Sequence, residues 1–323
     1  FRPAIEKILA KLPPREKRQT LLFSATFPAQ LQAVTQLALR RAHQLIDCIG
    51  ATEEASNEQV EQGMQICTLE DLFSTVVAII DALTQEPHKI IVFLPTARET
   101  SLFAALLNII ELPETTILEI HSRKSQAQRT KISEQFRTIQ QGILFSSDVS
   151  ARGLDYPDVT FVLQVGAPSD RAQYLHRLGR TARAGKEGSG LLLLCDFERY
   201  FLQVLKDLPL VERPPPDSAA LDEASIMVDR ALPQLHAQNQ HIGAQAYQAW
   251  LGQHKSQIGK LKWSSSDLVE WANYFATDIM RLSEVPALEP KTIGMMGLKG
   301  VPGIVVAGQR NGKGNGKGKG RRW

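Results

Sequence analysis

The sequence predicts an α/β fold, with a parallel sheet that carries helices on both faces, followed by a small helical extension and a basic tail. Between about residues 18 and 195, short apolar runs alternate with longer helix-like stretches, as in proteins built on parallel sheets. Three prolines at 214–216 end the alternation, and the residues after them favour helices only. Because ligands of such sheets bind beyond the carboxyl ends of the strands, we expect the functional residues there.

The expected strands are continuous apolar runs such as Ile90–Leu94, which indicate burial on both faces of a sheet. They are Thr20–Ser24, Val60–Cys67, Lys89–Leu94, Thr116–His121, Gly142–Ser147, Thr160–Val165 and Ser189–Leu194. The helices expected between them are Ala29–Leu39, Leu69–Leu83, Ala97–Ile110, Ser125–Phe136, Ala172–Leu178 and Glu198–Leu205.

After the prolines, apolar residues recur at helical spacing over 268–282, and Asp267–Glu270 can form a capping box at the start of that helix. Ile242–Trp250 indicates an earlier helix. We expect the aromatic residues of both helices to pack a small core, with stacking on bases as the alternative. Glycines at every third position from 294 to 303 indicate a turn-rich loop, because four repeats are too few for collagen.

Composition limits the class of protein. The 323 residues are 43% hydrophobic and 22% charged, which predicts about two globular units and excludes disorder for most of the chain. No run approaches the ~18 apolar residues of a membrane-spanning helix. The three cysteines (Cys48, Cys67 and Cys195) form no CxxC motif. They therefore predict ordinary buried thiols in a reducing compartment rather than a disulfide scaffold or a zinc site.

The net charge of +3 conceals an asymmetry between body and tail. Residues 309–323 hold six cations and no acid, so residues 1–308 carry a net charge of −3. The tail alternates glycine with these cations, and its low complexity predicts disorder. The six cations are Arg310, Lys313, Lys317, Lys319, Arg321 and Arg322.

Two segments carry residues suited to phosphate binding. Arg177, Arg180 and Arg183 recur every third residue, so a helix would present them along one side, and their guanidinium groups match phosphate oxygens. A solvated basic helix face is the alternative, which the embedded Gly179 disfavours. The second segment, Ser146–Asp155, follows an apolar strand. Its hydroxyl and N–H groups can bind phosphates, and Asp155 can accept from a ribose hydroxyl.

Together these segments resemble the DEAD-box RNA helicases of superfamily 2. The other matching motifs are Ser24-Ala25-Thr26, the strand Ile91–Leu94 with Pro95-Thr96, and Ser125–Arg129, and all five occur in the order of that family. The segment His121-Ser122-Arg123, the ending Arg180–Arg183, the helical extension and the basic tail resemble the fungal mitochondrial branch.

The resemblance implies two RecA-like domains with ATP and RNA in the cleft between them. Arg180 and Arg183 would be the catalytic arginines that contact the γ-phosphate of ATP. Asp155 and Gly153 would also bind ATP, with Asp155 on the ribose. Arg152 would bridge to the partner domain.

The resemblance also implies an RNA surface and coupling residues. Thr96, Arg129 and Ser147 would bind RNA, with Thr96 the weakest candidate of the three. Ser24 and Thr26 would link hydrolysis to strand separation. His176 would lie at the domain interface, although a lone histidine can equally be a satisfied core residue.

Two motifs of the family are missing. The sequence holds no G-x-x-x-x-G-K-[ST] phosphate loop, and Asp222-Glu223-Ala224-Ser225 only mimics an Asp-Glu-Ala-Asp box because it ends in serine and follows a proline linker. We therefore expect a C-terminal portion of a helicase. In this arrangement residues 1–48 are the remnant of the first RecA-like domain and 49–208 the second. Residues 209–290 form the helical extension, and 291–323 the Gly-rich, basic, disordered tail.

The leading hypothesis is an ATP-dependent RNA helicase whose missing half holds the Mg²⁺ ligands, so this portion alone would be inactive and would contain no metal site. The alternative is a non-catalytic RecA-like module that binds RNA and uses the tail as a tether. A superfamily 2 helicase acting on DNA is a third reading. We expect RNA and ATP as partners, no membrane and an intracellular location, with mitochondria one option by resemblance. The oligomeric state stays open.

Overall fold

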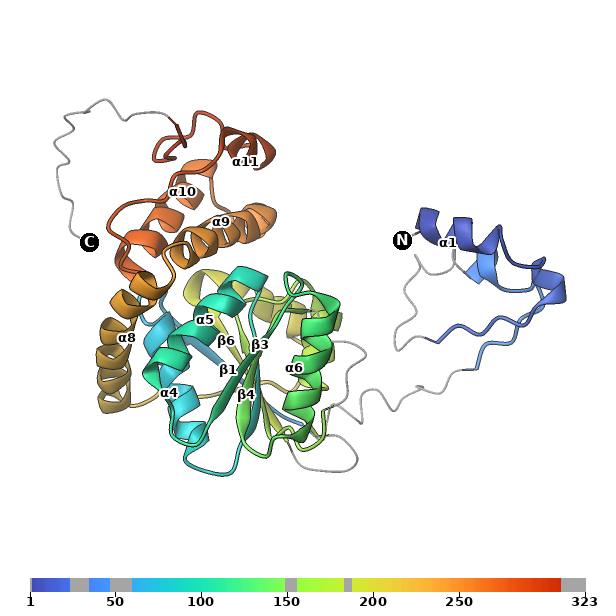
Figure 1. Cartoon of the computed structure of the whole chain (residues 1–323), viewed down its shortest axis with the longest axis horizontal. Helices are drawn as coiled ribbons and strands as arrows, with labels where there is room; N and C mark the ends of the chain where they lie inside the picture. Colours follow the sequence, from blue (N-terminus) through green and yellow to red (C-terminus); the bar gives the residue numbers. More distant parts are fainter. Residues whose placement is uncertain (1, 24–34, 47–59, 149–155, 183–187, 309–323) are drawn as a thin grey trace. The chain divides into compact units, whose positions relative to one another are not determined.

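The structure is a computed structural model of the chain, and it describes residues 2–23, 35–46, 60–148, 156–182 and 188–308. The chain divides into two compact units, Phe1–Asn57 and Glu58–Trp323 (Figure 1). The boundary expected at residues 48 and 49 falls in a segment outside the described residues.

The first unit contains α1 (Arg2–Leu9), the 3-10 helix η1 (Arg15–Lys17) and a helical turn at residues 35–38. Arg18 connects its parts, since its guanidinium donates to the carbonyl of Pro13 at 2.7 Å and to that of Ala38 at 3.3 Å. The prediction of a strand at Thr20–Ser24 differs from the structure. Residues 20–23 have no strand assignment, and Phe23 is 90% exposed. Without a pairing partner among the described residues, an extended segment forms no ladder.

The second unit is built on one parallel sheet, in which the described strands have the order β3-β4-β2-β5-β6-β1-β7. Six predicted strands are confirmed to within a residue or two at each end, and only the two-residue β7 was missed, because it is too short to show a pattern. The strands are β1 (Glu61–Cys67), β2 (Lys89–Phe93), β3 (Thr116–Ile120), β4 (Gly142–Ser146), β5 (Phe161–Val165), β6 (Ser189–Cys195) and β7 (Val211–Glu212).

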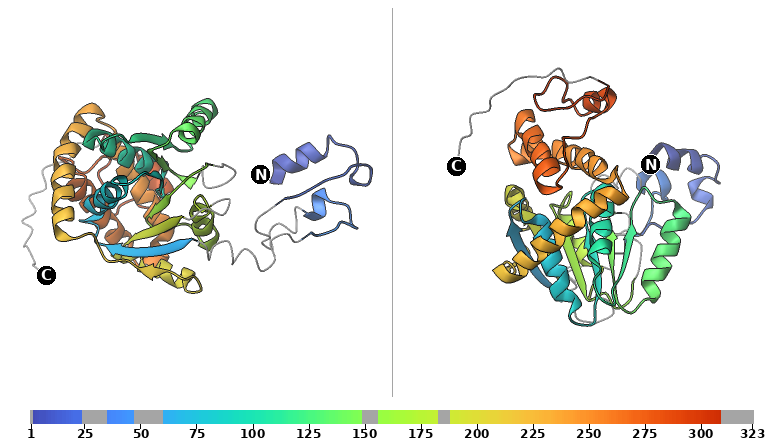
Figure 2. Two further views of the ribbon diagram at one scale, coloured as in Figure 1. Left: turned by 90° about the horizontal axis from the view of Figure 1, so that it is seen from below. Right: turned by 60° about the vertical axis from the view of Figure 1, so that its left-hand side comes forward.

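Helices cover both faces of the sheet, as predicted (Figure 2). Alternate strand residues separate the two layers: Ile90 and Val92 pack with α4 and α5, whereas Ile91 and Phe93 pack with α6. The segments α7 and η3 cover the same face as α6, over β6. Their bounds are α4 (Leu72–Thr84), α5 (Ala97–Ile110), α6 (Gln126–Thr138), α7 (Arg171–Leu178) and the 3-10 helix η3 (Asp196–Leu205).

The helical extension forms a further layer on the side of α4 and α5. Helix α8 packs against both of them and α9 packs against α5. Trp250 and Phe275 stack at 5.3 Å between ring centroids and are almost fully buried, which confirms that the aromatic residues pack a core. The elements are α8 (Ser218–Gln238), α9 (Ile242–Leu261), α10 (Ser265–Tyr274), the π-helix η4 (Phe275–Ile279) and α11 (Pro290–Met295).

Two details of this region differ from the sequence-based expectations. The capping box of α10 starts at Ser264, whose hydroxyl accepts the N–H of Asp267 at 3.1 Å, while the Asp267 carboxylate accepts the N–H of Ser264 at 2.8 Å. The segment 291–308, assigned to the tail, instead contains α11 and turns, and its Leu298 is fully buried. Gly297 and Gly303 adopt positive φ there, which glycine allows at low cost. Residues 309–323 lie outside the described residues.

Candidate functional site

Five predicted site residues lie among the described residues, and the sheet gathers two of them at its carboxyl edge. Thr96 follows β2 and Ser147 follows β4, and these strands are neighbours. Arg129 lies on α6, His176 on α7, and Arg180 directly after α7. The predicted residues outside the described segments are Ser24, Thr26, Arg152, Gly153, Asp155 and Arg183.

Thr96 has a structural role in addition to its place at this edge. It is the N-cap of α5, where its hydroxyl accepts the N–H of Glu99 and donates to the Glu99 carboxylate at 2.6 Å. Burial raises the pKa of Glu99 to about 7, against the opposing effect of the Thr96 hydrogen bond and with a contribution from the nearby Glu198. The Thr96 hydroxyl is therefore occupied by Glu99, both as acceptor and as donor.

Ser147 lies where β4 leaves the sheet, and it is only 7% exposed. Its N–H donates to the carbonyl of Ile120 at 3.2 Å, which joins the ends of β3 and β4. The hydroxyl of Ser146 donates to the Ser147 carbonyl at 2.6 Å. These bonds fix the turn, so the position of Ser147 is determined by the sheet.

Arg129 lies near the start of α6, where one of its nitrogen atoms is buried. Its helix, α6, begins with a full capping box between Ser125 and Gln128, which sets the direction of the first turn. The Nε of Arg129 is buried and has no hydrogen-bond partner among the described residues. A buried donor without a partner costs free energy.

The arginine run after β5 does not form one exposed helix face, which corrects the expectation for Arg177. Arg177 is fully buried, and its guanidinium donates to the Asp148 carboxylate from Nη2 at 2.6 Å and from Nε at 2.8 Å. Gln173 donates to the same oxygen at 2.8 Å, and Phe93 lies under the guanidinium at 5.4 Å. Burial lowers the pKa of Arg177, and the charges of Asp148 and Asp170 oppose that shift.

Helix α7 ends at Leu178, so Arg180 lies beyond it rather than on its side. Gly179 is the C-cap, and the Nε of Arg180 donates to the carbonyl of His176 at 3.1 Å. His176 and Arg180 are both partly buried. The segment packs tightly, because a Cβ at Gly190 of β6 would lie 2.4 Å from a methyl of Leu178.

Sequence reasoning missed the partnership of Arg177 with Asp148. Both residues stand in the two segments that it singled out, but their pairing depends on α7 lying over the end of β4. Local spacing shows neither that arrangement nor the burial of Arg177.

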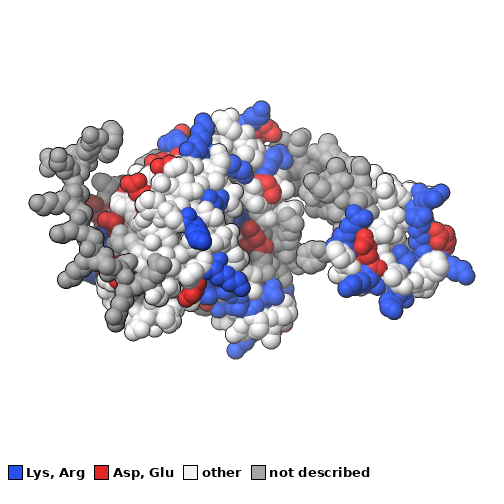
Figure 3. All heavy atoms as spheres, turned by 90° about the horizontal axis from the view of Figure 1, so that it is seen from above, with Lys and Arg blue, Asp and Glu red and all other residues white. Residues whose placement is uncertain are grey.

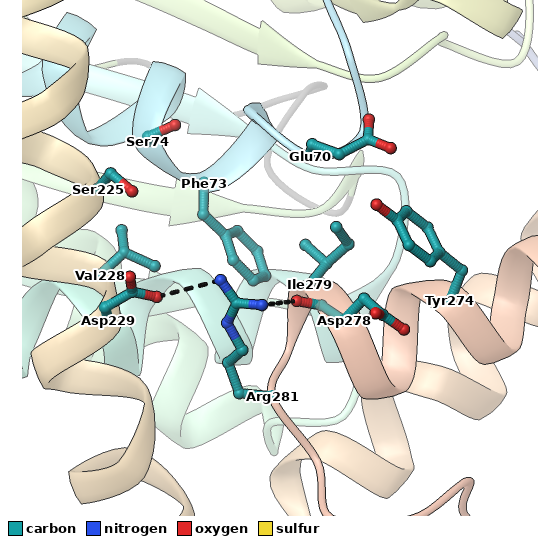
Figure 4. A pocket seen from close by; sticks show the side chains of 10 residues that line it. All are labelled: Glu70, Phe73, Ser74, Ser225, Val228, Asp229, Tyr274, Asp278, Ile279 and Arg281. Atoms are coloured by element: carbon teal, nitrogen blue, oxygen red, sulfur yellow. Dashed lines mark hydrogen bonds and ion pairs between the residues drawn. The ribbon is translucent and has the colours of Figure 1, made fainter. Parts of the chain in front are cut away.

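The described residues contain neither a metal site nor a membrane-spanning helix. They contain no group of three or more His, Cys, Asp or Glu able to hold a metal ion, and no helix long and apolar enough to cross a membrane. Acidic and basic side chains are interspersed over the face seen in Figure 3. A pocket of about 250 Å³ lies elsewhere, between α4, α8 and η4, where Arg281 bonds Asp229 and the Asp278 carbonyl (Figure 4).

Comparison with known proteins places the chain among helicases. Residues 68–185 match the family model of the helicase conserved C-terminal domain. DEAD-box ATP-dependent RNA helicase 31 of Arabidopsis thaliana is 45% identical over 309 residues, which cover 94% of this chain and 41% of that protein. Helicase 25 of the same plant is 44% identical over 311 residues, covering 95% and 53%. The chain thus spans about half the length of these relatives.

Solved structures of helicases share the fold. Mss116p bound to single-stranded RNA and AMP-PNP superposes with a TM-score of 0.73 at 27% identity, covering 94% of this chain and 61% of that one. Domain 2 of Mss116p bound to an RNA duplex gives a TM-score of 0.60 at 27% identity, covering 75% and 96%. These matches confirm a RecA-like sheet and support the resemblance to the fungal mitochondrial branch. With its motifs in the order expected, this chain is a member of the DEAD-box RNA helicase family and corresponds to the C-terminal portion of its helicase region.

Proposed function

We propose that this chain supplies the second RecA-like half of an ATP-dependent RNA helicase, which separates or remodels RNA strands as it hydrolyses ATP. The observation that carries the proposal is the place of two family-motif residues at the carboxyl edge of the sheet. Thr96 and Ser147 follow the neighbouring strands β2 and β4 there, which is where parallel sheets bind ligands. Arg180 lies away from that edge, towards the start of β5, because the hydroxyl of the adjacent Thr181 donates to the carbonyl of Val159.

Each residue takes a role that its chemistry supports. Arg129, a partly exposed cation on α6, and the turn at Ser147 would hold RNA phosphates. Arg180 and Arg183 would stabilise charge that develops on the γ-phosphate. Asp155 would hold the ribose. ATP would supply the phosphoryl group, and side chains of this protein would orient that group and neutralise its negative charge.

Residues 1–48 would be part of the first RecA-like domain. In support, few of the described side chains of the first unit are buried. Thr35 and Ala38 are 7% and 4% exposed, whereas the apolar Leu21 and Phe23 are 66% and 90% exposed. Such apolar side chains favour packing against further protein. Among the described residues we assign no Mg²⁺ ligand, because they offer no suitable cluster.

ATP hydrolysis tests the enzymatic part of the proposal. We expect the 323-residue chain alone to show no RNA-stimulated ATPase activity, because it has no phosphate loop. In the intact protein, Arg180→Ala should lower kcat by ~10³-fold or more with RNA affinity nearly unchanged. Lys206→Ala, at an exposed position after η3, is the control. A loss of only a few-fold for Arg180→Ala would reduce Arg180 to a structural role.

Measurements of RNA affinity test the assignment of Arg129 to RNA. Fluorescence anisotropy with a single-stranded RNA should show weaker binding for Arg129→Ala than for Lys131→Ala, which removes the same charge from an exposed position of α6. Equal affinities for the two variants would contradict the assignment of Arg129. RNA binding by an intact protein that hydrolyses no ATP would favour the non-catalytic RNA-binding module.

A further inference from the structure

Cys67 and Cys195 are far apart in the sequence but adjacent in the sheet. The parallel register of β1 and β6 pairs them directly at the last position of each strand. Residues paired in this way project from the same face of a sheet, and both cysteines pack in the same apolar cluster. The proximity of Cys67 raises the pKa of the Cys195 thiol. The fold therefore builds a pair of thiols that nothing in the local sequence indicates.

The backbone already has a separation compatible with a disulfide. Neighbouring strands lie ~4.8 Å apart, and disulfides join residues whose Cα atoms are ~4.4–6.8 Å apart. Because the register fixes the two Cα atoms opposite each other, bond formation needs side-chain rotation and no rearrangement of the strands.

The two thiols differ in accessibility. Cys67 is partly exposed and lines a cavity of about 390 Å³ together with Thr68, Arg199 and Pro215. Cys195 is 4% exposed. The neighbouring Cys67 and burial both raise the pKa of the Cys195 thiol. A reagent that enters the cavity thus meets Cys67 first, and Cys195 lies behind it as the second thiol.

We propose that Cys67 and Cys195 form a reversible dithiol–disulfide site that exchanges with small disulfides such as glutathione disulfide. The Cys67 thiolate attacks one sulfur of the oxidant, which releases the first glutathione thiolate and leaves a mixed disulfide. Cys195 then loses its proton and attacks the Cys67 sulfur, which releases the second glutathione. Two protein thiols are oxidised to one disulfide, and one glutathione disulfide is reduced to two glutathione molecules.

This site is independent of the proposed helicase function. Its cavity is lined by the end of β1, the start of η3, Pro215 of the connection to α8 and Leu221 of α8 itself. None of its residues is among those assigned to ATP or RNA. Oxidation there would cross-link β1 to β6 next to the connection between the sheet and the helical extension.

Peptide mapping under non-reducing conditions tests the proposal. After incubation of the folded chain with glutathione disulfide, we expect a Cys67–Cys195 linked peptide that dithiothreitol removes. Cys67→Ser and Cys195→Ser should each abolish the link, and Cys48→Ser should keep it. A stable glutathione adduct on Cys67, a link to Cys48, or no reaction at native pH would each overturn the proposal.

A second measurement does not rely on the variants. Phenylarsine oxide binds two neighbouring thiols at once, so one equivalent should protect both Cys67 and Cys195 of the unmodified chain from alkylation. A dithiol should reverse the protection more readily than a monothiol at equal thiol concentration. Alkylation of Cys67 at the unprotected rate would show that the two sulfurs do not act together.

Discussion

Arg177 and Asp148 join helix α7 to the turn after strand β4 through a two-pronged ion pair in which the arginine is buried and the carboxylate is partly exposed. The guanidinium of Arg177 is 1% exposed, and its two nitrogens lie 2.6 and 2.8 Å from one oxygen of Asp148. Asp148 immediately follows Ser147, and Arg177 lies three residues before Arg180. The pair therefore connects the turn assigned to RNA with the segment assigned to ATP, and we assign Arg177 a positioning role.

Removing one partner should be costly for stability. Arg177→Met removes the charged hydrogen bonds to Asp148 and leaves behind a carboxylate that is 45% exposed to solvent. The expected loss of stability is therefore that of charged hydrogen bonds, ~1.5–3 kcal/mol. Urea unfolding measures the change. Arg171→Met, at a half-exposed position of the same helix, should change stability by no more than ~0.5 kcal/mol.

The coupling between the two residues can be measured separately. A cycle of Arg177→Met, Asp148→Leu and the double variant should give an interaction energy between ~0.5 and 3 kcal/mol. Additive effects would show that the ion pair contributes nothing beyond packing.

The buried carboxyl of Glu99 should make stability fall as pH rises. Its pKa is raised to about 7 in the folded state by burial and by Glu198, whereas the ordinary value is 4.5. The folded state then holds the proton more tightly, so stability decreases between pH 4.5 and 7 and the loss is complete above that range. Glu99→Gln should reduce the loss by at most ~3 kcal/mol.

Urea unfolding at pH 5 and pH 7.5 checks this effect, with Glu134→Gln on the exposed side of α6 as the matched control. Glu198 also has a pKa of about 7. Part of the fall in the free energy of unfolding with rising pH should therefore remain in Glu99→Gln. If the free energy of unfolding of Glu99→Gln falls with pH as much as that of the unmodified chain, position 99 holds no buried, titrating carboxyl.

The buried His254 should make folding stability fall as pH decreases, which is the opposite of the effect of Glu99. Burial lowers its pKa to about 4 from 6.5, although its bond to the Trp250 carbonyl opposes the shift. The folded state excludes the proton, so the contribution is present above pH 6.5 and is lost as pH falls towards 4. His254→Phe keeps a ring against Trp250 and should remove roughly 2 kcal/mol of the loss between pH 7 and pH 5.

The exposed His241 provides the control, since His241→Asn should leave the acid-side loss unchanged. If His254→Phe loses as much stability as the unmodified chain on acidification, another group is responsible for it.

Local patterns predicted the elements well and their partnerships poorly. Helix Ala97–Ile110 has the predicted bounds because its signal is local: a capping threonine followed by an apolar stripe. The burial of Arg177 and the pairing of Cys67 with Cys195 depend on the strand order, which places β1 beside β6. The cap at Ser264 was missed because Asp267 occupies N3 of the same box, and both residues favour helix starts.

The basic tail should add RNA affinity without sequence preference. Residues 309–323 hold six cations and no acid, and cations on a glycine-rich segment can meet phosphates without reading bases. Single-stranded nucleic acid gives a salt slope of about −0.7 per neutralised phosphate, so these cations should contribute a slope of up to about −4. Anisotropy titrations at several salt concentrations measure it in the intact chain and in a variant ending at Gly308.

A second variant separates charge from length. Replacing the six cations of 309–323 by glutamine keeps the length of the tail, and we expect it to lose as much affinity and salt dependence as the deletion does. The contribution should also be the same for RNAs of unrelated sequence, because phosphate contacts carry no base information. If the shortened chain keeps both its affinity and its salt slope, the tail does not bind RNA, and the affinity must come from the edge of the sheet alone.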